Sequence, residues 1–280
     1  MKLIRLALML PVFVCLLSTF TTAQTEFFSS EFDEDWIDLE IVVDNPFVNG
    51  DGPLVSGASI STPASNGNPG ANRLSAYNLT AGDWVLSGGK CEDWIYEPSQ
   101  QGPIESFNFD LDAAGTNLDG QGNQPVMVVL EQDDTLYFSV DDFAINFNNS
   151  GFVPFSANEL VSDSFDTNPA AIAGSTPRDG QTPDFSSSGN EIRFGYVILS
   201  GILTGGPTLT TTARIDNLSI TVSSQIVGDI NCDGEVNLLD VAPFVELITT
   251  GGFLDKADVN EDGVVDLLDV SPFVALLSDG

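Results

Sequence analysis

The sequence predicts a mainly β chain in which an antiparallel two-sheet sandwich precedes a small helical domain. Over most of the 280 residues, short runs of β-branched and aromatic residues alternate with clusters of Gly, Asn, Asp, Pro and Ser. No convincing helical period occurs in that part of the chain. Near the end of the chain a polar segment occurs twice, and an amphipathic helical pattern follows each copy.

Residues 1–23 carry the three parts of a secretory signal peptide. Lys2 and Arg5 supply positive charge, an apolar run extends from Leu6 to Phe20, and small residues end the segment. The apolar run is shorter than the ~20 residues that a membrane-spanning helix needs. We therefore expect a mature protein without a membrane span, secreted to the extracellular space or the cell surface.

Residues 24–222 are expected to form the sandwich, and 223–227 a short linker to a domain at 228–280. Strand patterns with the composition and alternation of half-buried strands occur at 36–43, 83–86, 104–111, 125–130, 135–140, 191–198 and 214–222. Asp133-Asp134 is expected to form a tight hairpin turn, and 46–72 a long polar loop. Many short strands without intervening helices indicate a jelly-roll sandwich, with a closed barrel as the alternative.

Charge and composition exclude several classes of function. The chain has 8 Lys and Arg against 41 Asp and Glu, so we expect no nucleic-acid partner, because such binding needs clustered basic residues. Histidine is absent, which rules out Ser-His-Asp and Cys-His catalysis and histidine-ligated zinc. Cys91 and Cys232 fall in different expected domains, so no disulfide framework is indicated, although a single cross-link stays open.

The duplicated segment runs from Asp229 to Asp240 and recurs from Asp258 to Asp269. Each copy places carboxylate or amide side chains at loop positions 1, 3, 5, 9 and 12 and glycine at position 6. This spacing lets a twelve-residue loop surround one calcium ion with oxygen atoms, and glycine tolerates the sharp turn at position 6. The sequence therefore predicts two calcium ions and a tail whose folding depends on them.

An amphipathic helix is expected after each loop. Pro243 and Pro272 lie near the helix starts, where the missing N–H costs little. The two apolar faces are expected to pack together, because one copy alone has too small a core, with Phe253 and Leu254 adding to it. The expected faces consist of Val241, Phe244, Val245 and Ile248, and of Val270, Phe273, Val274 and Leu277.

Residues 228–280 resemble the type I dockerin, a module of two calcium-binding loop–helix repeats that docks onto a cohesin domain. The resemblance rests on the loops, their glycines, Val236 and Val265 at position 8, and the near-identical duplication. It implies a cohesin-like partner. The ligands that it implies are Asp229, Asn231, Asp233, Glu235 (carbonyl), Asn237 and Asp240, and Asp258, Asn260, Asp262, Val264 (carbonyl), Asp266 and Asp269.

Positions 10 and 11 of the loops depart from the dockerin pattern. Many dockerins carry small hydroxyl residues there that contact cohesin, whereas this chain has Leu238-Leu239 and Leu267-Leu268. The sequence leaves two roles open for these leucines. They either belong to the core or form an apolar docking patch.

The sandwich region resembles bacterial secreted jelly-roll domains of the concanavalin-like or carbohydrate-binding-module type. The resemblance is carried by Asn68–Ala71, Tyr96–Ile104, Pro183–Phe185, Phe194–Tyr196 and Ile215–Ile220. It implies recognition of an extracellular polysaccharide. Aromatic rings stack on sugar faces, so the candidate ligand-binding residues are Trp84, Trp94 and Tyr96, each with a core role as the alternative.

The expected function is calcium-dependent docking by the tail and polysaccharide recognition by the sandwich. One alternative is a dockerin-borne glycoside hydrolase, which requires two carboxylates about 5–10 Å apart in a groove. The acidic stretch Glu31–Asp35 is a candidate for one such strand and is otherwise a solvated terminus. The second alternative is a structural cell-surface component with neither feature.

Overall fold

The chain divides by its internal contacts into two compact units, Gln24–Ser224 and a second that includes Gln225–Gly280. The computed structural model describes residues 23–44, 57–79, 83–116, 124–140, 144–145, 151–169, 171, 177–201, 209–231, 235–260 and 262–279. The expected signal peptide lies outside the described residues except for Ala23, with which the first strand begins. No helix in the described parts is long and apolar enough to cross a membrane.

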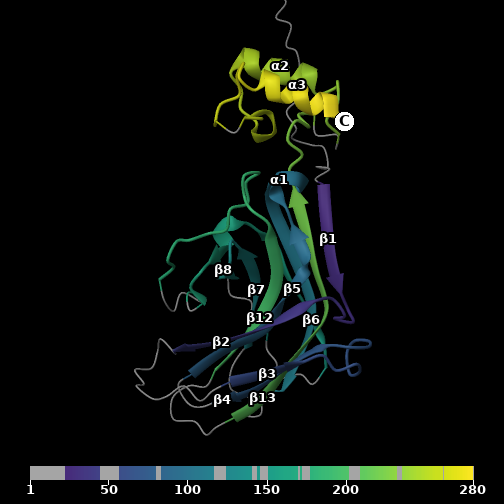
Figure 1. Cartoon of the computed structure of the whole chain (residues 1–280), viewed down its shortest axis with the longest axis vertical. Coiled ribbons are helices and arrows are strands. Elements are labelled where there is room, and N and C mark those ends of the chain that lie inside the picture. Colours follow the sequence, from purple (N-terminus) through teal and green to yellow (C-terminus); the bar gives the residue numbers. More distant parts are fainter. Residues whose placement is uncertain are drawn as a thin grey trace, which may run out of the picture. The chain divides into compact units, whose positions relative to one another are not determined.

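The larger unit is an antiparallel sandwich of two sheets (Figure 1). In the first sheet the strand order is β10-β6-β13-β4-β3, and β1 pairs with β13. Within this order β13 lies between β6 and β4, antiparallel to both. The bounds of these strands are β1 Ala23–Ser29, β3 Gly57–Ser61, β4 Arg73–Leu79, β6 Ile104–Thr116, β10 Val153–Leu160 and β13 Leu209–Ser224.

The second sheet has the order β11-β8-β7-β12-β5-β2, with the short strand β9 paired to β7. Its central strand β12 is antiparallel to both β5 and β7. Short helical turns α1 (Pro98–Gln101) and η1 (Ser162–Ser164) connect the sheets. The strands are β2 Trp36–Asp44, β5 Asp83–Tyr96, β7 Gln124–Gln132, β8 Thr135–Ser139, β9 Ala144–Ile145, β11 Phe165–Asp166 and β12 Ile192–Gly201.

Every strand expected from the sequence is present, which confirms the mainly β fold and the two-sheet architecture. The expected turn at Asp133-Asp134 is also confirmed: it joins β7 to β8, and both residues have positive φ, 54° and 59°. The expectation of an uninterrupted loop at 46–72 is wrong, because β3 lies within it. β3 has the sequence GASIS, whose small residues give little strand signal.

Side chains alternate across the strands and form apolar clusters on both faces of the second sheet. The main cluster lies between the sheets and includes Phe107, Phe109, Phe194 and Tyr196, all fully buried. A smaller cluster draws only on strands of the second sheet and therefore lies on its outer face. Its buried members are Leu86, Met127, Val129, Phe138, Val197 and Leu199.

The C-terminal unit contains two helices that run side by side, α2 (Val241–Thr250) and α3 (Val270–Asp279) (Figure 1). Gly251 ends α2 in the left-handed conformation, with its N–H donated to the carbonyl of Leu247, as glycine C-caps commonly do. A short 3-10 helix, η3 (Asp255–Ala257), leads into the second loop. Both helices expected from the sequence are thus confirmed.

Candidate functional site

The aromatic residues expected to bind sugar do not form a surface platform among the described side chains. Trp94 is 4% exposed and Tyr96 fully buried, and both belong to the cluster between the sheets. Trp94 stacks on Phe27, with ring centroids 5.8 Å apart, and the Tyr96 hydroxyl donates toward the carbonyl of Gly102. Trp84 lies on β5, but its side chain is outside the described part. The rings of Trp94 and Tyr96 are therefore part of the hydrophobic core.

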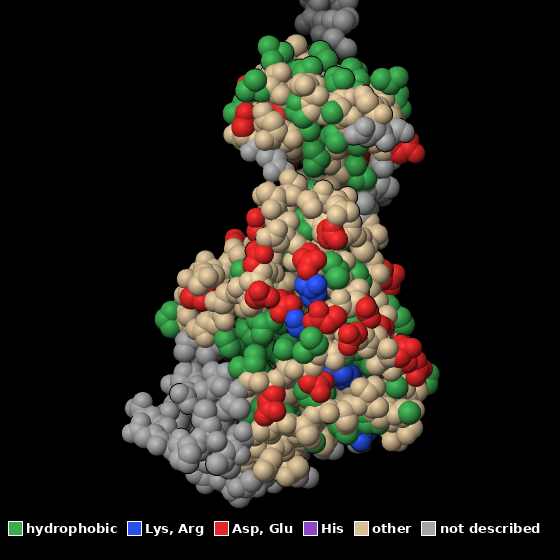
Figure 2. All heavy atoms as spheres, in the orientation of Figure 1, with side chains coloured by type: hydrophobic (Ala, Val, Ile, Leu, Met, Phe, Trp, Pro, Cys, Tyr) green, Lys and Arg blue, Asp and Glu red, His purple; other side chains and the backbone are tan. Residues whose placement is uncertain are grey.

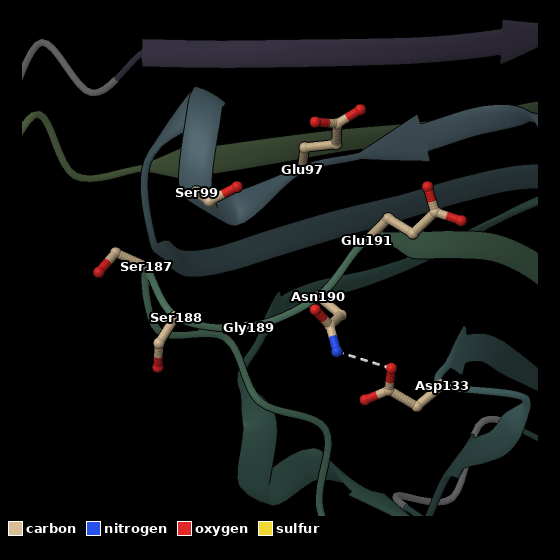
Figure 3. Close-up of a pocket in the computed structure, with 8 residues that line it drawn as sticks. All are labelled: Glu97, Ser99, Asp133, Ser187, Ser188, Gly189, Asn190 and Glu191. Atoms are coloured by element: carbon tan, nitrogen blue, oxygen red, sulfur yellow. Dashed lines mark hydrogen bonds between the residues drawn. The ribbon is translucent and has the colours of Figure 1, made fainter.

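A polar hollow of about 550 Å³ opens at the surface of the sandwich (Figure 3). Its walls come from the start of α1, the β7–β8 turn and the segment before β12. The Asn190 amide points toward Asp133 and donates to its carboxylate at 2.7 Å. The lining residues are Glu97, Ser99, Asp133, Ser187, Ser188, Gly189, Asn190 and Glu191.

The buried side chain of Gln132 holds one wall of this hollow in place. Its amide donates to the carbonyls of Asp184 and Asn190, at 2.9 and 3.0 Å. In return its oxygen accepts the N–H of Asp184 at 2.7 Å. These bonds tie the segment before β12 to the end of β7. This site could not be predicted from the sequence, because its residues are common turn residues from three separate segments.

A chain of ion pairs lies beside the hollow, on the outer face of the second sheet. Lys90 contacts Glu92 at 3.0 Å and also contacts Glu131, while Arg193 contacts Glu92 at 3.1 Å and Glu191 at 2.6 Å. Figure 2 shows basic side chains surrounded by acidic ones on one face of the sandwich. Burial alone would lower the pKa of Lys90, but Glu131 and Glu92 outweigh it and raise that pKa.

This network brings two carboxylates, Glu92 and Glu131, to one ammonium group. A glycosidase also needs two neighbouring carboxyl groups, but one of them must carry a proton to donate. Here both carboxylates contact the same Lys90 ammonium, so the arrangement suits a structural ion pair better. In the acidic stretch Glu31–Asp35, the carboxylate of Glu34 accepts hydrogen bonds from the side chains of Ser29 and Trp36 at 2.7 and 3.1 Å. These bonds give Glu34 a structural role.

The two loops of the C-terminal unit are closed in the same way by their last residue. In the first loop, Asp240 Oδ1 accepts the N–H of Ile230 at 2.7 Å and that of Asn231 at 2.9 Å, and Oδ2 accepts that of Asn237 at 2.9 Å. Each loop is thereby drawn into a ring around its position-12 carboxylate.

The second loop repeats these bonds. Asp269 Oδ1 accepts the N–H of Asn260 at 3.0 Å, and Oδ2 accepts that of Asp266 at 2.8 Å. Its position-6 glycine, Gly263, has φ +86°, the conformation for which the sequence motif requires glycine. Position 1 is also held, because Asp258 accepts the N–H groups of Asp262 and Gly263 at 3.1 and 2.8 Å.

Among the other predicted ligands, the side-chain oxygens of Asn237, Asn260, Asp262 and Asp266 accept nearby backbone N–H groups. The oxygen of Asn260 accepts the N–H of Asp262 at 2.9 Å, and Asp266 accepts that of Leu268 at 2.6 Å. Glu235 and Val264, expected to offer carbonyls, have exposed side chains. Asp233 lies outside the described residues. Within the described part, no three Asp, Glu or Cys side chains converge tightly enough to enclose a metal ion.

The donor set nevertheless fits calcium. Asp229, Asp240, Asp258 and Asp269 are at least nine-tenths buried, and burying several carboxylates together is costly unless a cation compensates their charge. For Asp240, Asp258 and Asp269, the bonds to backbone N–H groups of the described residues use only part of the lone-pair capacity of the carboxylate. Hard oxygen donors on a flexible loop are what calcium prefers, so a bound ion would draw positions 3, 5 and 9 inward.

The helices after the loops pack through equivalent residues. Phe244 and Phe273 are both buried, and with Ile230, Ala257 and Val265 they form the core of this unit. The prediction of the two apolar faces is partly wrong, since the side chains of Val245 and Val274 are about half exposed. Phe253 is also exposed, while its neighbour Leu254 packs on the core as expected. Leu247 takes a place on the buried face of α2 that the sequence pattern did not assign.

Residues 227–273 match the family described as Dockerin type I domain. This segment is a type I dockerin domain. The match covers both loops, α2 and the start of α3. No curated protein matches the chain in sequence.

Among solved structures, several carbohydrate-binding modules are similar to the sandwich. The family 11 module of the cellulosomal cellulase Lic26A-Cel5E from Clostridium thermocellum has a TM-score of 0.43 at 10% identity, covering 73% of this chain and 98% of that one. The xylan-binding module CBM15 has a TM-score of 0.34 at 10% identity, covering 72% and 99%. The mannan-recognising TmCBM27 has a TM-score of 0.33 at 13% identity, covering 68% and 99%.

The leucine pairs of the dockerin domain are exposed. Leu238 and Leu239 are 80% and 66% exposed, and Leu267 and Leu268 are 75% and 65% exposed. Of the two roles left open by the sequence, the core role is therefore wrong. Figure 2 shows hydrophobic side chains over much of the visible face of this unit. Exposed apolar side chains in such numbers on a small module are typical of an interaction surface.

Proposed function

We propose that this is a secreted protein whose dockerin domain binds one calcium ion in each loop and then docks onto a cohesin-like partner. The observation that carries the proposal is the equivalence of Asp240 and Asp269, which close both loops by the same backbone bonds. The expected ligands are the residues at positions 1, 3, 5, 7, 9 and 12 of each loop.

The docking surface is proposed to include both leucine pairs, one contributed by each repeat. Burying a leucine side chain stabilises a complex by about 1.5–3 kcal/mol. Where many dockerins present hydroxyl groups, this one presents four apolar side chains. The partner is therefore expected to offer a complementary apolar face, which would distinguish it from cohesins that select serine or threonine.

The sandwich is proposed to engage an extracellular polysaccharide. The polar hollow supports this part, because it combines hydroxyl groups, an amide and carboxylates, the groups that hydrogen-bond to sugar hydroxyls. It has no aromatic residue among those that line it. Recognition there would depend on hydrogen bonds rather than on stacking.

The docking proposal is tested by calcium titration of the full chain followed by calorimetry against a set of cohesin domains. We expect two bound calcium ions, and cohesin binding that chelator abolishes. An unchanged helical circular dichroism signal after chelation, together with no heat on calcium addition, would contradict it.

The sandwich proposal is tested with a glycan array and a reducing-sugar assay on the calcium-loaded protein. We expect binding to a polysaccharide that Asn190→Ala weakens, without release of reducing sugar. Release of sugar would favour the hydrolase. Neither binding nor release would favour a structural component.

A further inference from the structure

The first loop has a buried cation beside it. Lys256 belongs to η3, before the second loop, yet its Nζ lies 3.6 Å from Oδ2 of Asp229, the first residue of the first loop. The lysine side chain is 10% exposed and the aspartate side chain is fully buried. The backbone holds these segments together, because the N–H of Gly228 donates to the carbonyl of Lys256 at 2.8 Å.

The second loop has a different residue at the equivalent place. Lys256 stands two residues before Asp258, and the residue two before Asp229 is Val227. The position-1 aspartate of the second loop, Asp258, accepts two backbone N–H groups. Those groups are dipoles without net charge, whereas the ammonium near Asp229 carries a full positive charge. The loops have the same ligand types at positions 1, 3, 5 and 12. They differ at position 9, where the second loop has Asp266 in place of Asn237, and in the charged group beside position 1.

We propose that Lys256 makes the two calcium sites of the dockerin domain unequal. When the first loop holds no calcium, the ammonium compensates the buried charge of Asp229. When calcium enters, the same carboxylate faces two cations, and their repulsion weakens binding at the first loop. The second loop therefore fills first, and the first loop fills only at higher calcium concentration. This inference rests on the proposed calcium binding by both loops.

The test isolates each loop in the full chain by removing the position-12 carboxylate of the other. In Asp269→Asn only the first loop keeps its complete set of ligands, and in Asp240→Asn only the second loop does. In each background, calcium affinity is measured by calorimetry for the native Lys256, for Lys256→Met, which keeps the aliphatic stem, and for Lys256→Arg, which keeps the charge. Urea unfolding with chelator measures the metal-free stability of the same proteins.

With Lys256→Met, the first loop is expected to bind calcium about tenfold more tightly. Coulomb's law gives this factor for a single and a double positive charge roughly 6 Å apart at the dielectric constant of water. The second loop is expected to change less than about twofold, since Lys256 contacts Asp229 of the first loop. Lys256→Arg should retain the native affinity of the first loop. In chelator, Lys256→Met should unfold at lower urea, because Asp229 loses its counter-charge.

Unchanged or weaker calcium binding by the first loop in Lys256→Met would overturn the proposal, as would an equal gain in both loops. If Lys256→Met does not fold, Lys256→Gln replaces it in the same two backgrounds, and the change in calcium affinity of each loop is compared in the same way. Absence of calcium binding in both single-loop backgrounds would instead contradict the proposed function itself.

Discussion

The rings of Phe244 and Phe273 meet in the core of the dockerin domain with their centroids 4.3 Å apart and their planes at 38°. The two residues occupy the same place in the two repeats, one on each helix. Their contact joins the repeats into one core, which also contains Ile230 and Val265 from the loops. The helices and the loops are therefore expected to fold as one cooperative unit.

Phe244→Ala is expected to destabilise the whole C-terminal unit by about 3–4 kcal/mol, because it removes half of this ring pair and leaves a cavity. Urea unfolding of the calcium-loaded protein, followed by helical circular dichroism, measures the effect. Val245→Ala on the same helix is the matched control, since Val245 is about half exposed and should change stability by less than about 0.5 kcal/mol. Equal effects of the two substitutions would contradict the predicted core.

Replacing all four exposed leucines by serine is expected to weaken cohesin binding by roughly thirtyfold or more, since several buried leucine contacts would be lost. Calorimetry against the best cohesin partner provides the measurement. Calcium affinity is the internal control, because the leucine side chains point to solvent and the loop ligands stay unchanged. If partner affinity is preserved, the leucine pairs lie outside the docking surface.

Lys90→Met is expected to destabilise the sandwich by about 3 kcal/mol, because Glu92 and Glu131 would be left partly buried without their shared ammonium. Arg178→Met serves as control: Arg178 is exposed, and one of its contacts is the carbonyl of Asp163. Thermal unfolding of the full chain at neutral pH, monitored by near-ultraviolet circular dichroism, compares the variants. Similar losses of stability in Lys90→Met and Arg178→Met would indicate that the ion-pair network stabilises the sandwich no more than a surface ion pair does.

Lys90 also gives a pH dependence with a definite sign. Its pKa is raised in the folded protein, so its stabilising contribution is complete below the unfolded pKa, near 10.4. That contribution is lost as the pH rises through the higher folded value. The stability difference between the native protein and Lys90→Met should therefore be constant from pH 7 to about 9 and shrink at more alkaline pH.

Cys91 is free and buried in the core of the sandwich, where burial raises the pKa of its thiol to about 12. We expect negligible alkylation of Cys91 at pH 8 in the folded protein and rapid alkylation in denaturant. Because Cys232 lies outside the described residues, the experiment uses the Cys232→Ser variant, and mass spectrometry identifies the site. Fast modification under native conditions would mean that the core opens at β5.

The thiol of Cys91 also contributes to the pH dependence of stability at alkaline pH. Its raised pKa favours the folded state below the unfolded value, near 8.5, and this preference is lost as the pH rises toward 12. Cys91→Ala should remove that part of the pH dependence while lowering stability at neutral pH through lost packing. Unfolding curves of both proteins between pH 8 and 11 provide the comparison.

The features that follow local rules could be predicted from the amino-acid sequence alone. Loop spacing, position-6 glycines and the duplication predict the two loops, and Gly263 has the positive φ that this prediction requires. Alternation and turn residues predict the long strands and the turn at Asp133-Asp134. These features depend on the preferences of a few neighbouring residues, so a short window of sequence contains them.

Which apolar and aromatic residues are buried could not be predicted in this way, because burial depends on how distant segments pack. Periodicity placed Val245 and Val274 on the buried faces, but the helix pair is too small to cover them. The same packing left Leu238 and Leu267 in solvent and enclosed Trp94 and Tyr96 between the sheets. The approach of Lys256 to Asp229 arises in the same way, because burial and charge contacts depend on segments that meet only after folding.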